Sequence, residues 1–156
     1  MSRAPGPGPD PELVFAVLNE VGIIHQLSSS ALLKVLPDGL QIAHFSVLNH
    51  MARLGDGCTP VRLARAFQVT KGAMTNTLQR LEARALVRIE PDPKDRRAKR
   101  VFFTDAGREM RTRCLSALGP ELARMGQALG ATPFETALPA LQAMRAWLDT
   151  DRDQVR

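Results

Sequence analysis

The sequence predicts a mainly α-helical protein with one small β-hairpin, and three observations support this. Apolar residues recur at helical spacing through most of the 156 residues. Two short helical segments, residues 59–67 and 71–86, are separated by only a tight turn, as in a helix–turn–helix unit. Two short alternating segments, residues 86–91 and 99–104, flank a strongly charged loop, as the strands of a hairpin do. The expected order is helix, helix, helix–turn–helix, hairpin, helix, helix.

The N-terminal third predicts a tail and two helices. Residues 1–10 are rich in Pro and Gly and lack an apolar signal-peptide core, so we expect a flexible tail. Residues 11–36 carry apolar side chains at helical spacing and predict a long helix that ends near Pro37. After a turn, residues 40–54 predict a second helix. Its expected buried face consists of Ile42, Phe45, Leu48, Met51 and Ala52.

The helix–turn–helix segment contains two threonines at helix starts. Thr59 suits the N-cap of the first short helix, and Pro60 its first helical position, where the missing N–H costs nothing. Residues 68–70 form the turn, and Thr70 is the expected N-cap of the second helix. The apolar stripe expected on that second helix consists of Met74, Leu78, Leu81 and Ala85.

The C-terminal part predicts two further helices. Thr104 is expected to cap a helix over residues 105–129, with Asp105 complementing its dipole. Pro120 is expected to kink or interrupt that helix. A Thr-Pro pair opens a last helix over residues 132–148, and the polar residues after it are expected to fray.

The charge of the chain is concentrated in its middle. The net charge is +5, but residues 58–104 hold eleven basic and four acidic residues, a net charge of +7. The remainder has ten basic and twelve acidic residues, a net charge of −2. This distribution favours a polyanion contact confined to one region, and nucleic acid over a merely basic surface.

Several function classes are disfavoured. No apolar run approaches the roughly 20 residues that span a bilayer, so a cytoplasmic protein is expected. Cys58 and Cys114 lack metal-ligand spacing, and His44 and His50 point about 120° apart on a helix, so neither a disulfide nor a metal site is predicted. No catalytic constellation or cofactor motif is present, so we expect no enzyme. Aromatic residues are only 4% of the chain and Tyr is absent, which disfavours base stacking on single strands.

The second helix of the helix–turn–helix has an outward face suited to base reading. Asn76 and Arg80 each lie roughly 160° from the stripe centred on Leu78. Asn can pair bidentately with adenine and Arg with guanine, while Thr75 offers a hydroxyl or a methyl group. The free N–H groups near Thr70 can bind a phosphate. The alternative for this face is an ordinary solvated surface.

The hairpin loop is shaped to reach a minor groove. Arg96 and Arg97 lie at its tip, and the negative potential of a narrow minor groove attracts arginine. Asp95 can accept hydrogen bonds from the Arg97 guanidinium or from loop N–H groups and so hold the tip in one geometry. At least one of Phe102 and Phe103 must face the core, because successive strand residues face opposite sides.

These segments resemble a known family. The stretch TPVRLARAFQVTKGAMTNTLQRLEARALVRIEPDPKDRRAKRVFFTDAG resembles the winged helix–turn–helix of the MarR family of bacterial transcriptional regulators, and the part from Asp92 to Gly107 resembles the family's wing signature. The flanking helices resemble the family's layout from about Glu12 to Leu148. The resemblance implies a homodimer, with residues 11–36 and 105–149 as the dimerisation region and residues 40–104 as the winged DNA-binding region.

The DNA-binding residues combine the sequence arguments above with this resemblance. The resemblance implies that Arg97 enters the minor groove with Asp95 as its partner. The complete predicted set is Thr59, Thr70, Lys71, Thr75, Asn76, Arg80, Asp95, Arg96, Arg97 and Arg100.

Two departures from the family pattern stand out. Ala85 stands where the family usually has glycine, so it must adopt a left-handed conformation or the helix must end differently. The reactive cysteine of the peroxide-sensing branch is absent from the first helix, so redox sensing is disfavoured, and Cys58 and Cys114 are expected to be ordinary thiols.

The resemblance also implies an effector, because many members release DNA when a small anionic aromatic molecule binds. The residues expected to bind it are His25, His44, Phe45, Met51 and Arg53, although both histidines are alternatively core hydrogen-bonding residues. The expected function is sequence-specific binding of a palindromic double-stranded operator by a homodimeric repressor without a cofactor. The alternative is a winged-helix module that binds an acidic protein partner.

Overall fold

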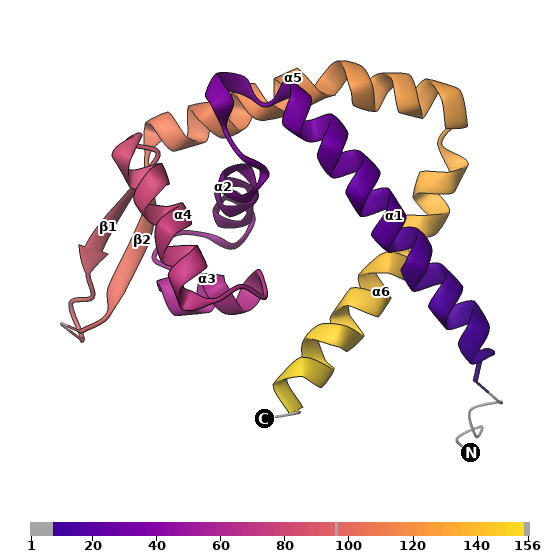
Figure 1. Cartoon of the computed structure of the whole chain (residues 1–156), viewed down its shortest axis with the longest axis horizontal. Helices are drawn as coiled ribbons and strands as arrows, with labels where there is room; N and C mark the ends of the chain where they lie inside the picture. Colours follow the sequence, from indigo (N-terminus) through magenta and orange to yellow (C-terminus); the bar gives the residue numbers. More distant parts are fainter. Residues whose placement is uncertain (1–7, 96, 155–156) are drawn as a thin grey trace. The chain divides into compact units, whose positions relative to one another are not determined.

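The computed structural model describes residues 8–95 and 97–154. The chain divides into two compact units, Met1–Ala117 and Leu118–Arg156. The first unit contains the elements from α1 to the hairpin and the start of α5, and Figure 1 shows α2, α3, α4 and the hairpin gathered together within it. The largest fully buried side chains of this unit are Leu40, Val47, Leu48, Met51, Leu63, Leu78, Leu81, Val87, Val101 and Cys114.

Helix α1 (Pro11–Val35) confirms the predicted long helix that ends before Pro37. The Asp10 side chain caps it by accepting from the Glu12 N–H at 3.0 Å, and Pro11 occupies its first position. No residue of α1 is buried in the single chain. Its large apolar side chains that remain exposed are Leu13, Val14, Phe15, Leu18, Val21, Ile23, Ile24, Leu27 and Leu33.

Helix α2 (Ile42–Leu54) follows the short 3-10 turn η1 (Pro37–Gly39). A reciprocal cap holds its start, because the Gln41 side chain binds the third backbone N–H while His44 Nδ1 accepts from the Gln41 N–H at 3.2 Å. The buried face consists of His44, Phe45, Val47, Leu48 and Met51. Burial of Ala52 was a wrong prediction, because the buried face is centred nearer Val47 and Leu48 and leaves Ala52 exposed.

Helices α3 (Pro60–Ala66) and α4 (Lys71–Ala83) form the predicted helix–turn–helix. Thr59 Oγ1 accepts from the Arg62 N–H at 3.3 Å, and Thr70 Oγ1 accepts from the Ala73 N–H at 3.1 Å, so both predicted N-caps are confirmed. The two helices pack through apolar residues that are buried: Leu63, Ala64, Met74, Leu78 and Leu81.

The end of α4 confirms the left-handed conformation, one of the two alternatives expected at Ala85, but not the place of Ala85 in the apolar stripe. Ala85 is exposed and lies beyond the helix with φ of 56°, so its assignment to the buried stripe was wrong. This left-handed residue reverses the chain and lets the Leu86 N–H reach the Leu81 carbonyl at 3.0 Å. Leu86 is buried and extends the apolar stripe in its place. An alanine in this conformation costs about 1–2 kcal/mol more than glycine does.

Strands β1 (Val87–Pro91) and β2 (Lys99–Phe103) form the predicted antiparallel hairpin, with Ile89 opposite Val101. Both of its outer edges are covered. The Ile89 N–H donates to Glu82 Oε1 at 3.0 Å, and the Val101 N–H donates to the Cys58 carbonyl at 2.9 Å. Phe103 is buried and Phe102 is half-buried, which confirms that one of this pair faces the core. The hairpin is therefore anchored to α4 on one side and to the loop before α3 on the other.

Helix α5 (Asp105–Leu129) begins at the predicted cap, where Thr104 Oγ1 accepts from the Gly107 N–H at 2.9 Å. A side chain at Gly107 is excluded, because its Cβ would lie 2.0 Å from the Leu86 carbonyl oxygen. The helix continues through Pro120, so of the two predicted outcomes the interruption is not observed, and a kink at Pro120 stays a prediction.

Helix α6 (Thr132–Gln154) extends past Leu148, so fraying from Asp149 was a wrong prediction. In the second unit the exposed large apolar side chains are Leu122, Met125, Leu129, Phe134, Leu138, Leu141, Met144, Trp147 and Leu148. No helix within residues 8–95 and 97–154 has the length and apolarity needed to cross a membrane.

Candidate nucleic-acid interface

The outward face of α4 presents the predicted base-reading side chains to solvent. Lys71, Thr75, Asn76 and Arg80 are all exposed, and Asn76 and Arg80 lie on the side of the helix opposite its buried stripe. Thr75 Oγ1 donates to the Lys71 carbonyl at 2.8 Å, so its proton is used within the helix while its methyl group and lone pairs remain available. Asn76 and Arg80 form no hydrogen bond or ion pair with any residue that the structure describes. Their polar atoms are therefore available to a ligand.

The two cap threonines lie at the N-termini of α3 and α4. Because Thr59 Oγ1 and Thr70 Oγ1 act as acceptors in their caps, each hydroxyl still has its own proton to donate. A helix N-terminus also favours an anion through its dipole and its unpaired N–H groups. The predicted contact of these threonines with DNA is compatible with their capping role, and it stays a prediction.

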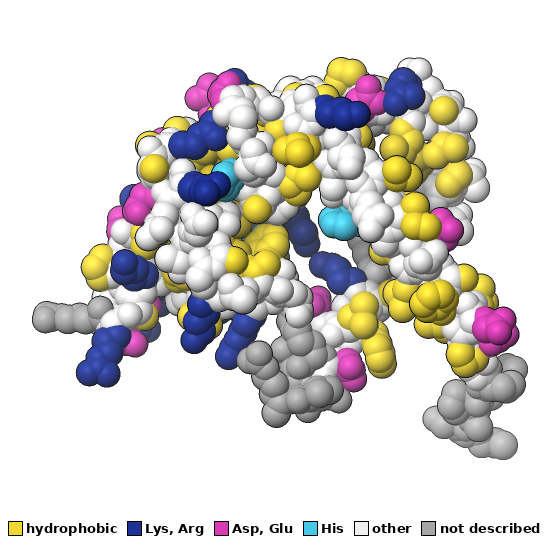
Figure 2. Space-filling view, in the orientation of Figure 1, with side chains coloured by type: hydrophobic (Ala, Val, Ile, Leu, Met, Phe, Trp, Pro, Cys, Tyr) yellow, Lys and Arg dark blue, Asp and Glu magenta, His cyan; other side chains and the backbone are white. Residues whose placement is uncertain are grey.

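Two basic residues of α3 were not among the predicted site residues. Arg62 and Arg65 are exposed and, three positions apart, share one face of the helix. Figure 2 shows Lys and Arg side chains gathered along the edge of the molecule formed by α3, α4 and the hairpin tip. The signal in the sequence was this spacing within a short helix next to the candidate reading helix.

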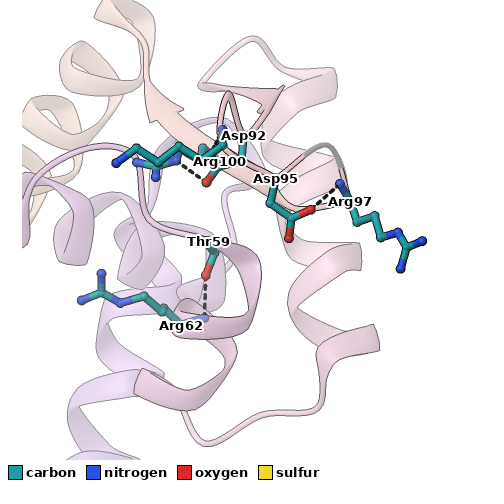
Figure 3. A network of polar contacts seen from close by, with 7 residues as sticks. Thr59, Arg62, Asp92, Asp95, Arg97 and Arg100 are labelled. Atoms are coloured by element: carbon teal, nitrogen blue, oxygen red, sulfur yellow. Dashed lines mark hydrogen bonds and ion pairs between the residues drawn. The ribbon is translucent and has the colours of Figure 1, made fainter.

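The hairpin loop is held by hydrogen bonds to Asp95. Its Oδ1 accepts from the Arg97 N–H at 2.9 Å, and its carbonyl accepts from the Ala98 N–H at 2.9 Å. Of the two partners predicted for this carboxylate, the structure therefore uses loop N–H groups. The Arg97 side chain is exposed and projects away from the loop (Figure 3). The predicted role of Arg96 falls outside the described residues.

Arg100 lies at the base of the same loop and is engaged within the protein. Its Nε donates to Asp92 Oδ2 at 2.7 Å, while Asp92 Oδ1 accepts from the Lys94 N–H at 2.8 Å (Figure 3). These bonds lower the pKa of Asp92, the Lys94 N–H contributing most and the Arg100 side chain next, so the carboxylate is ionised at neutral pH. The sequence did not identify Asp92 as a partner, because eight positions and a turn separate it from Arg100.

The five residues predicted to bind an effector fall into two groups. His44, Phe45 and Met51 are buried on α2, whereas His25 of α1 and Arg53 of α2 are exposed. Burial is the largest cause that lowers the pKa of His44, followed by the charges of Arg80 and Arg84, so its ring is neutral at neutral pH. The hydrogen bond of His44 to Gln41 agrees with the alternative that it is a core residue. An effector role for the five residues stays a prediction.

Within the described part of the chain, the cysteines and the acidic side chains form no metal centre. Cys58 is half-buried and Cys114 is buried, and neither forms a disulfide. Burial raises the pKa of the Cys114 thiol, which makes it less nucleophilic at neutral pH. Among residues 8–95 and 97–154, no three His, Cys, Asp or Glu side chains are grouped to hold a metal ion.

Comparison with known proteins identifies the fold and the family. Residues 38–98, which contain the helix–turn–helix, strand β1 and the hairpin loop, match the model of the MarR family. The matched region is a MarR-family winged helix–turn–helix. This match confirms the predicted class of winged helix–turn–helix regulator, mainly helical with a two-stranded hairpin, and agrees with the prediction that the protein is not an enzyme.

Individual MarR-family proteins resemble this chain over different lengths. The transcriptional activatory protein BadR of Rhodopseudomonas palustris is 28% identical over 100 residues, which are 63% of this chain and 55% of BadR. The match thus spans little more than half the length of that relative. The crystal structure of the transcriptional regulator BldR from Sulfolobus solfataricus has a TM-score of 0.76 at 25% identity, covering 89% of this chain and 99% of BldR.

A further solved structure is that of a mutant MarR from E. coli complexed with operator DNA. It has a TM-score of 0.70 at 25% identity, and the similarity covers 87% of this chain and 99% of the MarR chain. The winged helix–turn–helix of this chain is therefore shared with a protein that has been crystallised on an operator.

Proposed function

We propose that the protein binds a palindromic double-stranded operator as a homodimer and represses transcription there. The observation that carries the proposal is the projection of Asn76, Arg80 and Arg97 from one basic region with their polar ends exposed. The crystal structure of MarR complexed with operator DNA supports it, because that protein has the same fold and binds operator DNA.

The α4 helix is proposed to enter the major groove. Its outward face presents Asn76 and Arg80, which are able to bind an adenine edge and a guanine edge, and Lys71 is exposed at the first position of the helix, where it is able to bind a phosphate. Small residues Gly72 and Ala73 lie beside them, so the helix backbone is able to approach the bases closely. Arg62 and Arg65 of α3 are proposed to neutralise phosphates that flank the groove.

The hairpin is proposed to place Arg97 in the adjacent minor groove. A guanidinium is favoured there by the negative potential of a narrow groove, and the loop N–H bonds to Asp95 keep the tip in one geometry. This contact is expected to add affinity for A·T-rich flanks of the operator, where the minor groove is narrow.

The proposed dimer explains the exposed apolar helices. Helix α1 has no buried residue in the single chain, and α6 carries Leu138, Leu141 and Trp147 exposed. Monomeric proteins rarely expose such long apolar surfaces, so we infer that a second copy covers them. A dimer with two-fold symmetry presents two α4 helices to two half-sites of a palindrome.

Repression follows from position rather than from a contact within the protein. A dimer bound over a promoter excludes the polymerase. BadR is named a transcriptional activatory protein, so activation is the alternative to repression. We propose that a small anionic aromatic effector relieves this repression. The residues proposed to bind it are His25, His44, Phe45, Met51 and Arg53. A screen of aromatic carboxylates against the protein–operator complex tests this part, and failure of every compound to release DNA would contradict it.

Selection of bound fragments from the source genome tests the central proposal. The selected DNA is expected to share an inverted repeat with half-sites about 10 base pairs apart. The logarithm of the binding constant is expected to fall linearly with the logarithm of salt concentration. The slope of this plot is expected to be about −0.9 for each phosphate that the protein neutralises. Enrichment of no common sequence would contradict the proposal and favour a protein partner instead.

A further inference from the structure

We propose that Asp92 and Arg100 are positioning residues of the wing: their ion pair fixes the loop that presents Arg97, and Arg100 does not itself neutralise a DNA phosphate. This inference rests on the proposed function. It reassigns Arg100, which the sequence places among the DNA contacts, and it adds Asp92, which the sequence does not identify.

The geometry of the loop base supports the assignment. The loop is closed by the Asp92 N–H, which donates to the Ala98 carbonyl at 2.9 Å. The Asp92 carboxylate then holds both sides of the loop, accepting from the Lys94 N–H at 2.8 Å and from Arg100 Nε at 2.7 Å. One buried side chain therefore connects the outgoing strand, the loop and the returning strand.

The burial of Asp92 distinguishes it from a surface acid. The residue is 7% exposed, although the neighbouring loop residues Pro93, Lys94 and Asp95 are exposed. A carboxylate without partners in such a place would be strongly disfavoured, so its two bonded oxygens account for its presence. A carboxylate on a face that meets DNA also repels phosphates. This repulsion is offset only if the carboxylate stabilises the loop that makes the DNA contact.

Arg100 and Arg97 differ in what their side chains do. The Arg100 guanidinium is paired at the loop base, and Figure 3 shows it turned to Asp92, whereas Arg97 extends from the loop. The backbone of Arg97 is in turn fixed by Asp95. The two carboxylates thus hold successive parts of the loop, and the consequence of both is a defined position for the projecting Arg97 guanidinium.

Removal of the carboxylate gives opposite results under the two interpretations. If only net charge mattered, Asp92→Ala would free a cation and tighten binding to any DNA. If Asp92 positions the wing, Asp92→Ala weakens operator binding about three- to tenfold, in the range of one lost hydrogen bond of ordinary strength. Affinity for random DNA is then unchanged or higher. Equal or tighter operator binding by this variant would overturn the proposal.

The connection to Arg97 is measured by a double-mutant cycle on the full-length protein. In the Arg97→Ala background, Asp92→Ala is expected to reduce operator affinity by less than twofold, because the contact it positions is already absent. Full additivity of the two losses would overturn the positioning role. Asp92→Asn, which keeps the side-chain size and an acceptor for the Lys94 N–H, is expected to lose less affinity than Asp92→Ala.

The salt dependence of operator binding distinguishes a structural role of Arg100 within the wing from a contact between Arg100 and a DNA phosphate. Arg100→Ala is expected to lower operator affinity while leaving the slope of log affinity against log salt unchanged. A slope smaller by about one unit would show that Arg100 neutralises a phosphate and would overturn the reassignment. Glu90→Ala is the charge-matched control for Asp92→Ala, because it removes the same negative charge from the hairpin, while the ion pair that Glu90 forms among the described residues is with Arg88 and the Asp92–Arg100 pair is kept. Its operator affinity is expected to be unchanged or higher.

The proposed function can fail separately from this inference. If the parent protein and Arg97→Ala bind every DNA equally, the operator-binding proposal is wrong. If Arg97→Ala is defective and Asp92→Ala is not, only the positioning role is wrong. Thermal unfolding shows whether each variant is folded. If Asp92→Ala is not folded, Asp92→Asn serves as the test variant in its place.

Discussion

The backbone of Arg97 is bound within the loop while its side chain extends outward. Its N–H donates to Asp95 Oδ1, and its guanidinium is exposed. Because the charged end enters the minor groove in the proposed complex, Arg97→Ala is expected to lower operator affinity by about tenfold or more, as loss of a base-edge or groove arginine does. Fluorescence anisotropy with labelled operator measures this. Dimerisation, followed by sedimentation, should not change.

Arg97→Lys provides the control for charge at this position. Lysine keeps the positive charge but lacks the planar, weakly hydrated guanidinium, so its affinity is expected to lie between those of the parent and the alanine variant. Operator binding by Arg97→Ala at the parental affinity would show that the loop does not enter the groove.

Asn76 is expected to determine a base rather than general affinity. An asparagine amide is able to donate to and accept from one adenine edge, and Asn76 has no partner among the described residues that would compete. Asn76→Ala should relax preference at one position in each half-site, at a cost of about 1–3 kcal/mol for the preferred base. Binding to a library with each operator position randomised measures this. A uniform loss on all sequences would exclude base reading by Asn76, and Gln79→Ala on the flank of the same face is the control.

His44 makes stability depend on pH. Its Nδ1 accepts from the Gln41 N–H, which requires an unprotonated nitrogen, and burial lowers its pKa below the ordinary value. The unfolded chain therefore takes up a proton more readily than the folded one. The stabilisation is fully present above about pH 6.5 and is lost as the pH falls from there toward the folded-state pKa.

His44→Gln is expected to flatten this dependence, as measured by urea unfolding between pH 7.5 and pH 5, a window of about one unit or more on each side of an ordinary histidine pKa. His50, whose pKa is also lowered by burial and then by Arg53, accounts for the dependence that remains. An unchanged pH profile in His44→Gln would show that His44 does not contribute.

At the scale of single elements, caps and periodicity predicted the helix starts better than the helix ends. Thr59, Thr70 and Thr104 each accept the expected N–H, because a capping bond needs only residues two or three positions apart. The end of α4 was misplaced at Ala85, because an apolar residue four positions after Leu81 fits the stripe whatever its backbone conformation. Periodicity records spacing and does not reveal a left-handed residue; the glycine that the family usually has at this position indicated that alternative for Ala85.

The candidate site was predictable only in its exposed part. The outward face of α4 and the loop tip follow from local sequence, and the structure places Asn76, Arg80 and Arg97 on the surface as expected. The supporting contacts of Asp92 and Glu82 were not predicted, because their partners are reached across a turn or from another element. Such contacts depend on tertiary structure, and the identity of each acid alone does not indicate its partner.

Glu82 connects the reading helix to the hairpin. Its Oε1 accepts from the Ile89 N–H at 3.0 Å, and this bond joins α4 to the outer edge of β1. Since the angle between helix and hairpin sets the separation of the two groove contacts, Glu82→Ala is expected to weaken operator binding about two- to fivefold, as loss of one exposed hydrogen bond of about 0.5–1 kcal/mol implies. Anisotropy titrations measure the change.

Glu82→Gln distinguishes the bond from the charge. Glutamine keeps an oxygen acceptor for the Ile89 N–H but removes the negative charge, so it should bind the operator at least as tightly as the parent does. If both variants gained affinity equally, the role of Glu82 would be repulsion of phosphate, and the proposed connection would be wrong.

For the molecule as a whole, charge and apolar surface are segregated along the chain. The basic region at residues 58–104 faces solvent through α3, α4 and the hairpin, whereas the apolar side chains left exposed are concentrated on α1, on the second half of α5 and on α6. Isolated helices gain little stability without a packed apolar face, so these long helices need a covering surface. A second copy of the chain provides one with the same composition and matching symmetry.

Trp147 reports directly on that covering surface. It is the only tryptophan, the chain has no tyrosine, and its side chain is 65% exposed in the single chain. If the dimer buries Trp147, its emission maximum at high protein concentration lies at a shorter wavelength than in water. Dilution dissociates the dimer and moves this maximum to a longer wavelength. Leu18→Asp, which puts a charge on the apolar side of α1, is expected to give monomers with the long-wavelength emission at all concentrations. Gln26→Asp adds the same charge at a polar position of α1 and should behave as the parent does. Emission independent of concentration, together with a monomeric mass by sedimentation for the parent protein, would exclude the dimer and with it the reading of two half-sites.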